Sequence, residues 1–302
     1  MAPRSPLVLA ALASVAVPGL VPLTARALPG GDDVDAAEVT DGLARRWVIR
    51  APRTKAAAAL LEQEWRFVGA LPGALPFAVP RVAGTVPLPE GGRAGVHRTL
   101  EGAPVEPASL EPGPGLAAAL GRALATVHDL PPGLVEDAEL PVYTAPEYRT
   151  RRLAELDRAA ATGHVPAGLL ARWERALEEA GAWRFTPCVV HGDLAAENVL
   201  VTTDAVSCVL GWGQVRVADP ADDLAWLVAG APAEATESVL EAYAHTRRDA
   251  PDRDLLRRAR LAGELAVARW LLHGATTDDD GVVDDAVAML AQLEESVDGE
   301  PW

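Results

Sequence analysis

Cysteine is scarce in this chain of 302 residues: Cys188 and Cys208 are the only two, too few for a disulfide framework. Each lies in a short apolar run of the kind that forms a buried strand, where a small thiol packs well. We therefore expect both thiols to be reduced and the protein to work in a reducing compartment, the cytoplasm.

Positive charge is also in short supply. The chain has 27 lysine and arginine residues against 43 aspartate and glutamate residues, which gives a formal net charge of -16. Binding to a nucleic-acid backbone depends on cations that displace counterions from phosphates, so we do not expect nucleic acid as a partner. A cationic small molecule suits this charge better.

No apolar run is long enough to span a membrane apart from the N-terminal stretch Leu7–Val21, which Pro18 interrupts, so no membrane partner is expected. This stretch has two interpretations. Arg4 before it and the small residues Ala25-Arg26-Ala27 after it are typical of a secretory signal. We favour a first helix that ends at Pro18-Gly19, because the chain runs on without a change of composition into a strand-like pattern.

The first hundred residues predict short strands and one helix. Apolar runs separated by turn signals predict strands over 23–28, 34–39, 46–50 and 77–82. Apolar residues that recur at spacings of three and four predict a helix over 55–71. With 49% hydrophobic residues, the chain is large enough for one domain or for two closely apposed lobes.

Beyond Gly102 the pattern becomes mainly helical. Helices are predicted over 116–128, 145–161, 167–180, 233–245, 252–273 and 284–296. The exception is a pair of β-like runs, 188–190 and 199–210, which hold most of the chemically interesting residues. The expected fold class is therefore α+β.

The segment His191-Gly192-Asp193 leaves the first of these runs, and Asn198 stands five residues after the aspartate, where the second begins. This is the layout of a phosphotransfer catalytic loop. An acceptor hydroxyl must be held in line with the transferred phosphoryl group, and Asp193 would accept its proton or hydrogen bond. The side-chain oxygen of Asn198 would be a neutral ligand for a divalent ion that bridges the phosphates. We expect His191 to support the loop backbone rather than act as the base.

A second motif, Asp219-Pro220-Ala221-Asp222-Asp223-Leu224-Ala225, follows the loop, and Trp47-Val48-Ile49-Arg50 precedes it. With these segments the sequence resembles the aminoglycoside and macrolide phosphotransferase family over nearly its whole length, and the macrolide 2′-phosphotransferase branch most closely. The resemblance implies a two-lobed, protein-kinase-like fold. Residues 1–100 would form a small nucleotide-binding lobe with an antiparallel sheet and one helix, and residues 101–302 a larger, mainly helical lobe for catalysis and acceptor binding.

The resemblance also assigns roles to residues. Asp193 would be the catalytic carboxylate, with His191 in the same catalytic loop, and Asn198 would be a metal ligand. Asp219 and Asp223 would be structural acids that brace the catalytic loop. The alternative for these two acids is that they cap a helix near a turn.

Arg50 occupies the position of the strand cation that contacts the nucleotide's phosphates, where related kinases use lysine. Glu64 is its expected partner, because it lies on the apolar stripe of the predicted helix and a buried carboxylate without a cation is costly. Glu62 is placed instead to pair with Arg66, four residues on. The alternative for Glu64 is a tolerated residue at the edge of the stripe.

Three further residues are expected to bind the cofactor. Gly30 and Gly31 suit a turn whose backbone covers phosphates, although the same residues also make an ordinary hairpin connection. Val96 lies in 94–100, the expected hinge between lobes, where backbone groups would meet a purine base. The expected cofactors are ATP or GTP, with Mg²⁺.

One residue departs from the family pattern. Thirteen residues after Asn198 the family has an aspartate that binds metal, and this chain has Gly211. Glycine offers no side-chain oxygen, so the neutralisation of phosphate charge should weaken severely. The alternative is that Asp193, Glu197 or Gln214 supplies the missing oxygen in a rearranged site.

The C-terminal helices are expected to build the acceptor pocket. Acidic and aromatic side chains suited to a sugar that bears a protonated amine are Asp278, Asp279, Asp280, Asp284, Asp285, Trp226 and Trp270. Each of them is also compatible with a solvated loop acid or a core aromatic residue.

The sequence thus predicts an NTP-dependent phosphotransferase that acts on a hydroxyl of a cationic, sugar-containing small molecule, such as a macrolide or aminoglycoside antibiotic. The alternative is a catalytically degenerate protein of the same fold that binds such molecules without modifying them. Gly211 favours this alternative.

Overall fold

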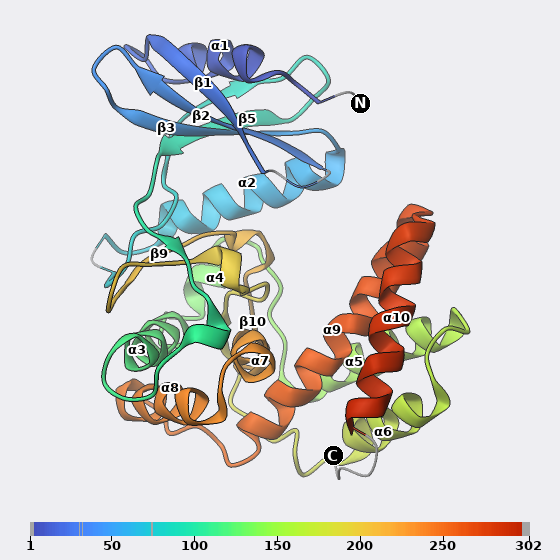
Figure 1. Cartoon of the computed structure of the whole chain (residues 1–302). Coiled ribbons are helices and arrows are strands. Elements are labelled where there is room, and N and C mark those ends of the chain that lie inside the picture. Colours follow the sequence, from blue (N-terminus) through green and yellow to red (C-terminus); the bar gives the residue numbers. More distant parts are fainter. Residues whose placement is uncertain (1–2, 30, 32, 74, 298–302) are drawn as a thin grey trace. The chain divides into compact units, whose positions relative to one another are not determined.

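The computed structural model describes residues 3–29, 31, 33–73 and 75–297, which fall into two compact units. The first unit comprises 1–105, 133–140 and 197–215, and the second comprises 106–132, 141–196 and 216–302. Figure 1 follows the chain through both units in colour. The first break lies close to the predicted boundary at residue 100, and the division of roles between two lobes stays a prediction.

The first unit is built on a five-stranded antiparallel sheet in the order β1-β2-β3-β5-β4. Its strands are β1 (Pro22–Leu28), β2 (Val34–Asp41), β3 (Arg46–Pro52), β4 (Val82–Pro87) and β5 (Arg93–Arg98). The strands predicted over 23–28, 34–39 and 46–50 are confirmed. The strand predicted over 77–82 is wrong, because Ala78 makes only an isolated bridge to Cys208. Pro76 precedes this segment and Pro80 lies within it, and neither residue can donate a hydrogen bond to a ladder.

Two helices, α1 (Pro6–Ala16) and α2 (Lys55–Ala70), cover opposite faces of this sheet, as Figure 1 shows. Both were predicted, and both are confirmed. Glycine lets each helix approach closely: a Cβ on Gly84 would lie 1.9 Å from the Ala16 carbonyl oxygen, and one on Gly95 would lie 2.4 Å from the Trp65 ring. The buried face of α1 packs on the sheet and forms the core of this unit with it.

The hairpin between β2 and β3 closes around the buried carboxylate of Asp41. Its two oxygens accept hydrogen bonds from the Leu43 and Arg45 amides at 2.9 Å, from the Arg45 side chain at 2.6 Å and from Trp47 Nε1 at 3.0 Å. Burial acts to raise the pKa of Asp41, but these bonds to the charged form outweigh it and hold the pKa well below its ordinary value.

We predict that Asp41 contributes stability that acid removes. Because the folded-state pKa is depressed, its contribution is present above the unfolded-state pKa of about 3.9 and is lost as the pH falls through the folded value. The free energy of unfolding, measured with urea between pH 7 and pH 3, should fall less steeply below pH 4 in Asp41→Asn than in the wild type. Asp204→Asn, at an exposed hairpin position, is the control. Equal slopes in all three proteins would contradict the prediction.

The remaining segments of the first unit carry the second predicted β run. Residues 199–210 form two strands rather than one, β8 (Val199–Val201) and β9 (Val206–Val209). Strand β8 pairs with β9 on one side and with β6 (Ala103–Pro104) on the other. A short 3₁₀ turn, Trp212–Gln214, follows β9, and the Trp212 ring stacks on Phe67 of α2 at 5.8 Å between centroids. This contact anchors the segment that contains Gly211. The unit also includes the short helix α4 (Gly133–Asp137).

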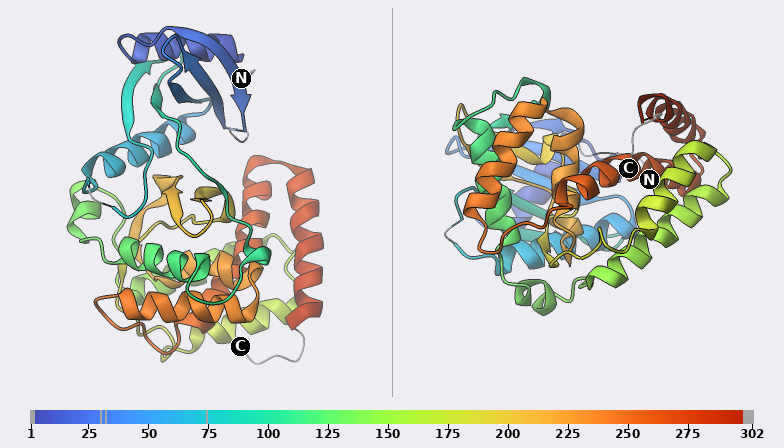
Figure 2. Two further views of the ribbon diagram at one scale, coloured as in Figure 1. Left: turned by 60° about the vertical axis from the view of Figure 1, so that its left-hand side comes forward. Right: turned by 90° about the horizontal axis from the view of Figure 1, so that it is seen from below.

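The second unit is mainly helical. It contains α3 (Leu116–His128), α5 (Ala145–Ala161), α6 (Ala167–Glu178), α7 (Ala221–Gly230), α8 (Ala233–Thr246), α9 (Leu255–Thr277) and α10 (Asp280–Val297). All but α7 were predicted, and those six are confirmed within a few residues. Helices α3 and α8 lie side by side (Figure 2). They approach closely at Gly121, where a Cβ would stand 2.2 Å from the Val239 carbonyl oxygen. None of the helices in the described part of the chain has the length and apolar character of a membrane span.

Candidate active site

The loop His191–Asp193 leaves the buried strand β7 (Cys188–Val190), which pairs with β10 (Arg216–Ala218). Helix α7 begins just beyond β10 and carries Asp223. This carboxylate accepts hydrogen bonds from the His191 amide at 2.7 Å and the Gly192 amide at 2.8 Å. Gly192 has a φ of +82°, which glycine adopts without strain, and the chain turns there toward Asp193. The predicted brace from Asp223 to the loop is confirmed.

Further contacts hold the loop and the Asp223 carboxylate in place. Arg216 donates from Nη2 to the Gly192 carbonyl oxygen at 3.1 Å. Buried His128 contacts the Asp223 carboxylate through Nε2 at 3.1 Å and the Tyr243 hydroxyl through Nδ1 at 2.8 Å. Burial acts to raise the pKa of Asp223, but the contact with His128 and the backbone bonds outweigh it and hold the pKa below its ordinary value. Asp223 is therefore charged at neutral pH, which suits a carboxylate that accepts hydrogen bonds from the His191 and Gly192 amides.

The prediction that Asp219 also braces the catalytic loop is wrong. Its carboxylate makes a bidentate ion pair with buried Arg258, at 2.6 and 3.1 Å, and accepts a bond from the Ala221 amide at 3.0 Å. Arg258 also reaches Asp252, at 2.7 Å. Asp219 thus ties the start of α7 to α9. The sequence could not show this, because a buried arginine on a distant helix has no local signature.

Asp193 lines a pocket of about 300 Å³ that lies wholly within the second unit. The lining residues are Arg152, Gly192, Asp193, Leu194, Ala195, Arg216, Asp222, Ala225, Trp226, Ala229, Gly263, Ala266 and Arg269. One part of this lining is apolar and aromatic, and the other is strongly charged. A pocket with an apolar surface and a few convergent polar groups is the usual form of a site for a small molecule.

Asp222 is the centre of the charged part. Its carboxylate pairs with Arg152 at 2.6 Å and Arg216 at 2.7 Å, and it accepts a hydrogen bond from the Tyr148 hydroxyl. Burial acts to raise the pKa of Asp222, but the two guanidinium groups outweigh it and hold the pKa well below its ordinary value. Arg152 also pairs with Glu155 at 2.8 Å. Apart from the Asp222 in the second motif, none of this network was predicted.

Of the predicted acceptor residues, Trp226 alone lines this pocket. Trp270 lies elsewhere on α9, where its ring stacks on His273 and its Nε1 donates to Asp285 at 2.8 Å. Asp278 adopts a left-handed backbone that ends α9. Trp226 on α7 thus lines the Asp193 pocket without the other predicted residues, and their role in acceptor binding stays a prediction.

In the first unit, Arg50 on β3 and buried Glu64 on α2 form the predicted pair: Arg50 Nη1 lies 2.8 Å from both carboxylate oxygens. The role of this pair toward a nucleotide stays a prediction. The pairing of Glu62 with Arg66 is wrong, since Glu62 reaches across to Arg93 of β5 at 2.8 Å. Arg66 instead lies 3.6 Å from Glu139.

The other predicted cofactor residues are placed differently. Val96 is buried in the middle of β5 and pairs with Ile49 on one side and Gly84 on the other. Because the backbone of Val96 lies between two paired strands, we do not expect its backbone groups to contact a purine base. We expect that contact at the residues after Arg98. Gly31 has a φ of +69° with open space around it, which suits a turn, and Gly30 lies outside the described residues.

Gly211 lies directly against Asn198 in the first unit. A Cβ on Gly211 would stand 2.8 Å from Asn198 Oδ1, so a carboxylate at position 211 would share the site of the Asn198 amide. The two positions are adjacent, and together they offer a metal ion one neutral side-chain oxygen and no charge. In the described ranges, no group of three or more histidine, cysteine or acidic side chains is placed to hold a metal ion. Of this pair only Asn198 could hold Mg²⁺, and its role as a metal ligand stays a prediction.

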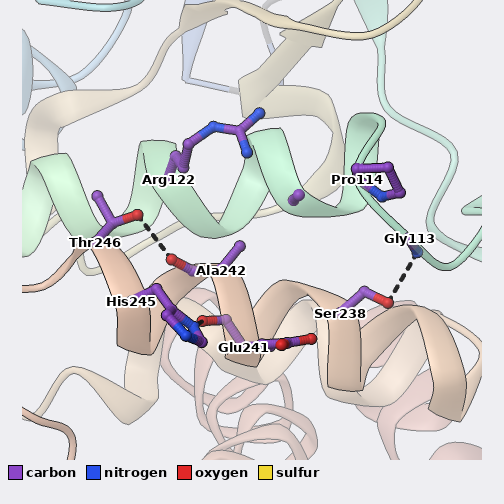
Figure 3. A pocket seen from close by; sticks show the side chains of 9 residues that line it. Gly113, Pro114, Arg122, Ser238, Glu241, Ala242, His245 and Thr246 are labelled. Atoms are coloured by element: carbon purple, nitrogen blue, oxygen red, sulfur yellow. Dashed lines mark hydrogen bonds between the residues drawn. The ribbon is translucent and has the colours of Figure 1, made fainter.

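A second hollow, of about 560 Å³, lies between α3 and α8 (Figure 3). Two of its hydroxyl groups bond to the backbone: Ser238 Oγ accepts from the Gly113 amide at 2.9 Å, and Thr246 Oγ1 donates to the Ala242 carbonyl oxygen at 2.7 Å. No residue of the catalytic loop lines it. The pocket at Asp193 is therefore the better candidate.

Comparison with known proteins agrees with this geometry. Residues 24–261 match the model of the phosphotransferase enzyme family. Viomycin phosphotransferase from Streptomyces vinaceus is 35% identical over 227 residues, which cover 67% of this chain and 76% of that protein. The macrolide 2′-phosphotransferase MphH from Brachybacterium faecium has a similar structure, with a TM-score of 0.81, 25% identity and coverage of 95% and 98% of the two chains. The GDP complex of aminoglycoside 2′-phosphotransferase-IIIa shares the fold at 18% identity, with a TM-score of 0.81 over 96% and 98%.

Proposed function

The chain belongs to the phosphotransferase enzyme family, and from this premise we propose that it transfers the terminal phosphoryl group of ATP or GTP to a hydroxyl of a sugar-containing small molecule of the antibiotic type. The observation that carries the proposal is the pair of hydrogen bonds from the loop amides to Asp223, which fixes the backbone before Asp193 beside a pocket. Relatives named for viomycin and macrolides support an antibiotic as the acceptor.

In this proposal Asp193 accepts the proton of the acceptor hydroxyl as the hydroxyl oxygen bonds to the terminal phosphorus and the nucleoside diphosphate leaves. Asp223 and Arg216 keep the loop backbone from moving during the transfer. Trp226 offers an aromatic face to the sugar ring. Arg50, held by Glu64, would contact the phosphates of the nucleotide.

The nucleotide is proposed as ATP or GTP, and the GDP complex of a protein with the same fold supports a purine nucleotide. Mg²⁺, when bound, would neutralise phosphate charge, with Asn198 as a ligand and the nucleotide's own phosphates and water as the others. Two free, buried cysteines favour a reducing compartment, and we propose the cytoplasm. The net charge of -16 favours an acceptor that is cationic as a whole.

A transfer assay tests the proposal. Purified protein is incubated with MgCl₂, either ATP or GTP, and viomycin, a macrolide or an aminoglycoside, and the acceptor is examined by mass spectrometry for an added phosphoryl group. We expect one acceptor to be modified in a nucleotide-dependent way. Failure of both nucleotides with all three acceptor classes would contradict the proposed activity.

A second function, binding without transfer, is favoured by the missing carboxylate at Gly211. The two functions differ in their response to metal in a thermal-shift titration, because a ligand that binds the folded protein more tightly stabilises it more. Nucleotide stabilisation that requires Mg²⁺ supports the enzyme. Stabilisation by nucleotide or drug that is indifferent to Mg²⁺ supports the binding protein.

A further inference from the structure

The charged part of the Asp193 pocket contains three guanidinium groups, and ion pairs join two of them to carboxylates. Arg152 and Arg216 share Asp222, and Arg152 also pairs with Glu155. The third arginine of the lining, Arg269, comes from α9. It makes no ion pair within 4.0 Å with any residue that the structure describes.

The terminal nitrogen Nη1 of Arg269 is buried. This atom has no hydrogen-bond partner in the described part of the chain. Burial and the nearby charge of Arg152 lower the pKa of Arg269 and outweigh the opposite influence of Asp222 and Glu155. An arginine nevertheless stays protonated in proteins, so the pocket holds a buried cationic donor that is not satisfied. Such a group costs stability unless a bound molecule completes its hydrogen bonds.

We infer that Arg269 binds an oxygen acceptor group of the small molecule, a carboxylate or a carbonyl, that enters the pocket beside Asp193. This inference rests on the proposed function, since it describes the acceptor of that reaction. A planar guanidinium matches these oxygens well and a carboxylate best. The negative net charge of the protein attracts a molecule whose own net charge is positive. Arg269 then orients this molecule, because it binds the end that carries the oxygen group.

Removing the arginine should have opposite effects on stability and on binding. Arg269→Met keeps the length of the side chain and removes the unsatisfied charge, so the melting temperature of the ligand-free protein should rise by about 2–4 °C. Arg260→Met is the matched control, because Arg260 is an exposed residue of the same helix. A fall in melting temperature in Arg269→Met, or a failure of this variant to fold, would show that Arg269 is a structural residue and would overturn the inference.

Three sugars serve as binding probes in the same thermal-shift experiment: glucuronate carries a carboxylate, glucuronamide a neutral carbonyl, and glucosamine an ammonium group. The wild type should be stabilised by glucuronate, more weakly by glucuronamide and not by glucosamine. Arg269→Met should bind glucuronate roughly ten- to hundredfold more weakly, the usual effect of losing a charged hydrogen bond. Equal stabilisation by glucuronate and glucosamine, no stabilisation by glucuronate, or an unchanged response in Arg269→Met would overturn the inference.

Neither readout requires phosphoryl transfer, so the two proposals fail separately. If the transfer assay succeeds and the Arg269 experiments fail, the enzyme stands and its acceptor is held by other residues. If transfer fails while glucuronate binds through Arg269, the pocket belongs to a binding protein.

Discussion

Asp193→Asn is expected to lower phosphoryl transfer by about 10²–10⁴-fold, the usual contribution of a positioned acid or base. Asparagine has the same shape as aspartate, but its amide cannot take the proton of the acceptor hydroxyl. The loop itself should keep its backbone conformation, because Asp223 holds the His191 and Gly192 amides and Arg216 holds the Gly192 carbonyl oxygen. The measurement is initial rate against acceptor concentration at saturating nucleotide.

The control for Asp193→Asn is Asp204→Asn, which removes one exposed acid between β8 and β9. Its rate should equal that of the wild type, so a loss in both variants would point to net charge as the cause. Thermal unfolding of Asp193→Asn should match the wild type within about 2 °C, as for most exposed substitutions. A variant that keeps the wild-type rate would remove Asp193 from the reaction.

Gly211→Asp is expected to raise Mg²⁺-dependent transfer by on the order of a hundredfold, since it adds an anionic group next to Asn198 where phosphate charge develops. The concentration of Mg²⁺ needed to stabilise the nucleotide complex in a thermal-shift experiment should fall as well. This second readout does not depend on turnover. The substitution also has a cost: a φ of +78° is less favourable for a residue with a side chain than for glycine, and the Asn198 amide must move to make room.

Two matched variants separate the carboxylate from the strain. Gly211→Asn has the shape and the backbone strain of the aspartate without its charge, and asparagine tolerates a left-handed backbone well. Gly211→Ala adds only the Cβ that meets Asn198. We expect both to remain at or below the wild-type rate. If aspartate and asparagine behave alike at this position, the glycine is not a lost metal ligand and the native site works by another arrangement.

The sequence by itself located the catalytic loop, the Arg50–Glu64 pair and most of the helices. These features depend on short spacings: an aspartate that leaves a buried strand, a carboxylate on the apolar stripe of one helix, and apolar residues that recur every three or four positions. Such patterns are set by local backbone geometry, which neighbouring residues determine. The motif around Asp223 was recognised for the same reason.

Only the tertiary structure determined which side chains surround the loop His191–Asp193. A charged network joins Tyr148 and Arg152 of α5 to Arg216 of β10 and Asp222 of α7. Arg269, from the distant helix α9, lines the same pocket. Buried arginines in helical segments look like surface residues in a sequence, because their burial depends on which distant elements pack against them. For the same physical reason the sequence did not predict the ion pairs of Asp219 with Arg258 and of Glu62 with Arg93. The packing of distant elements determines each partner, and spacing along the chain does not.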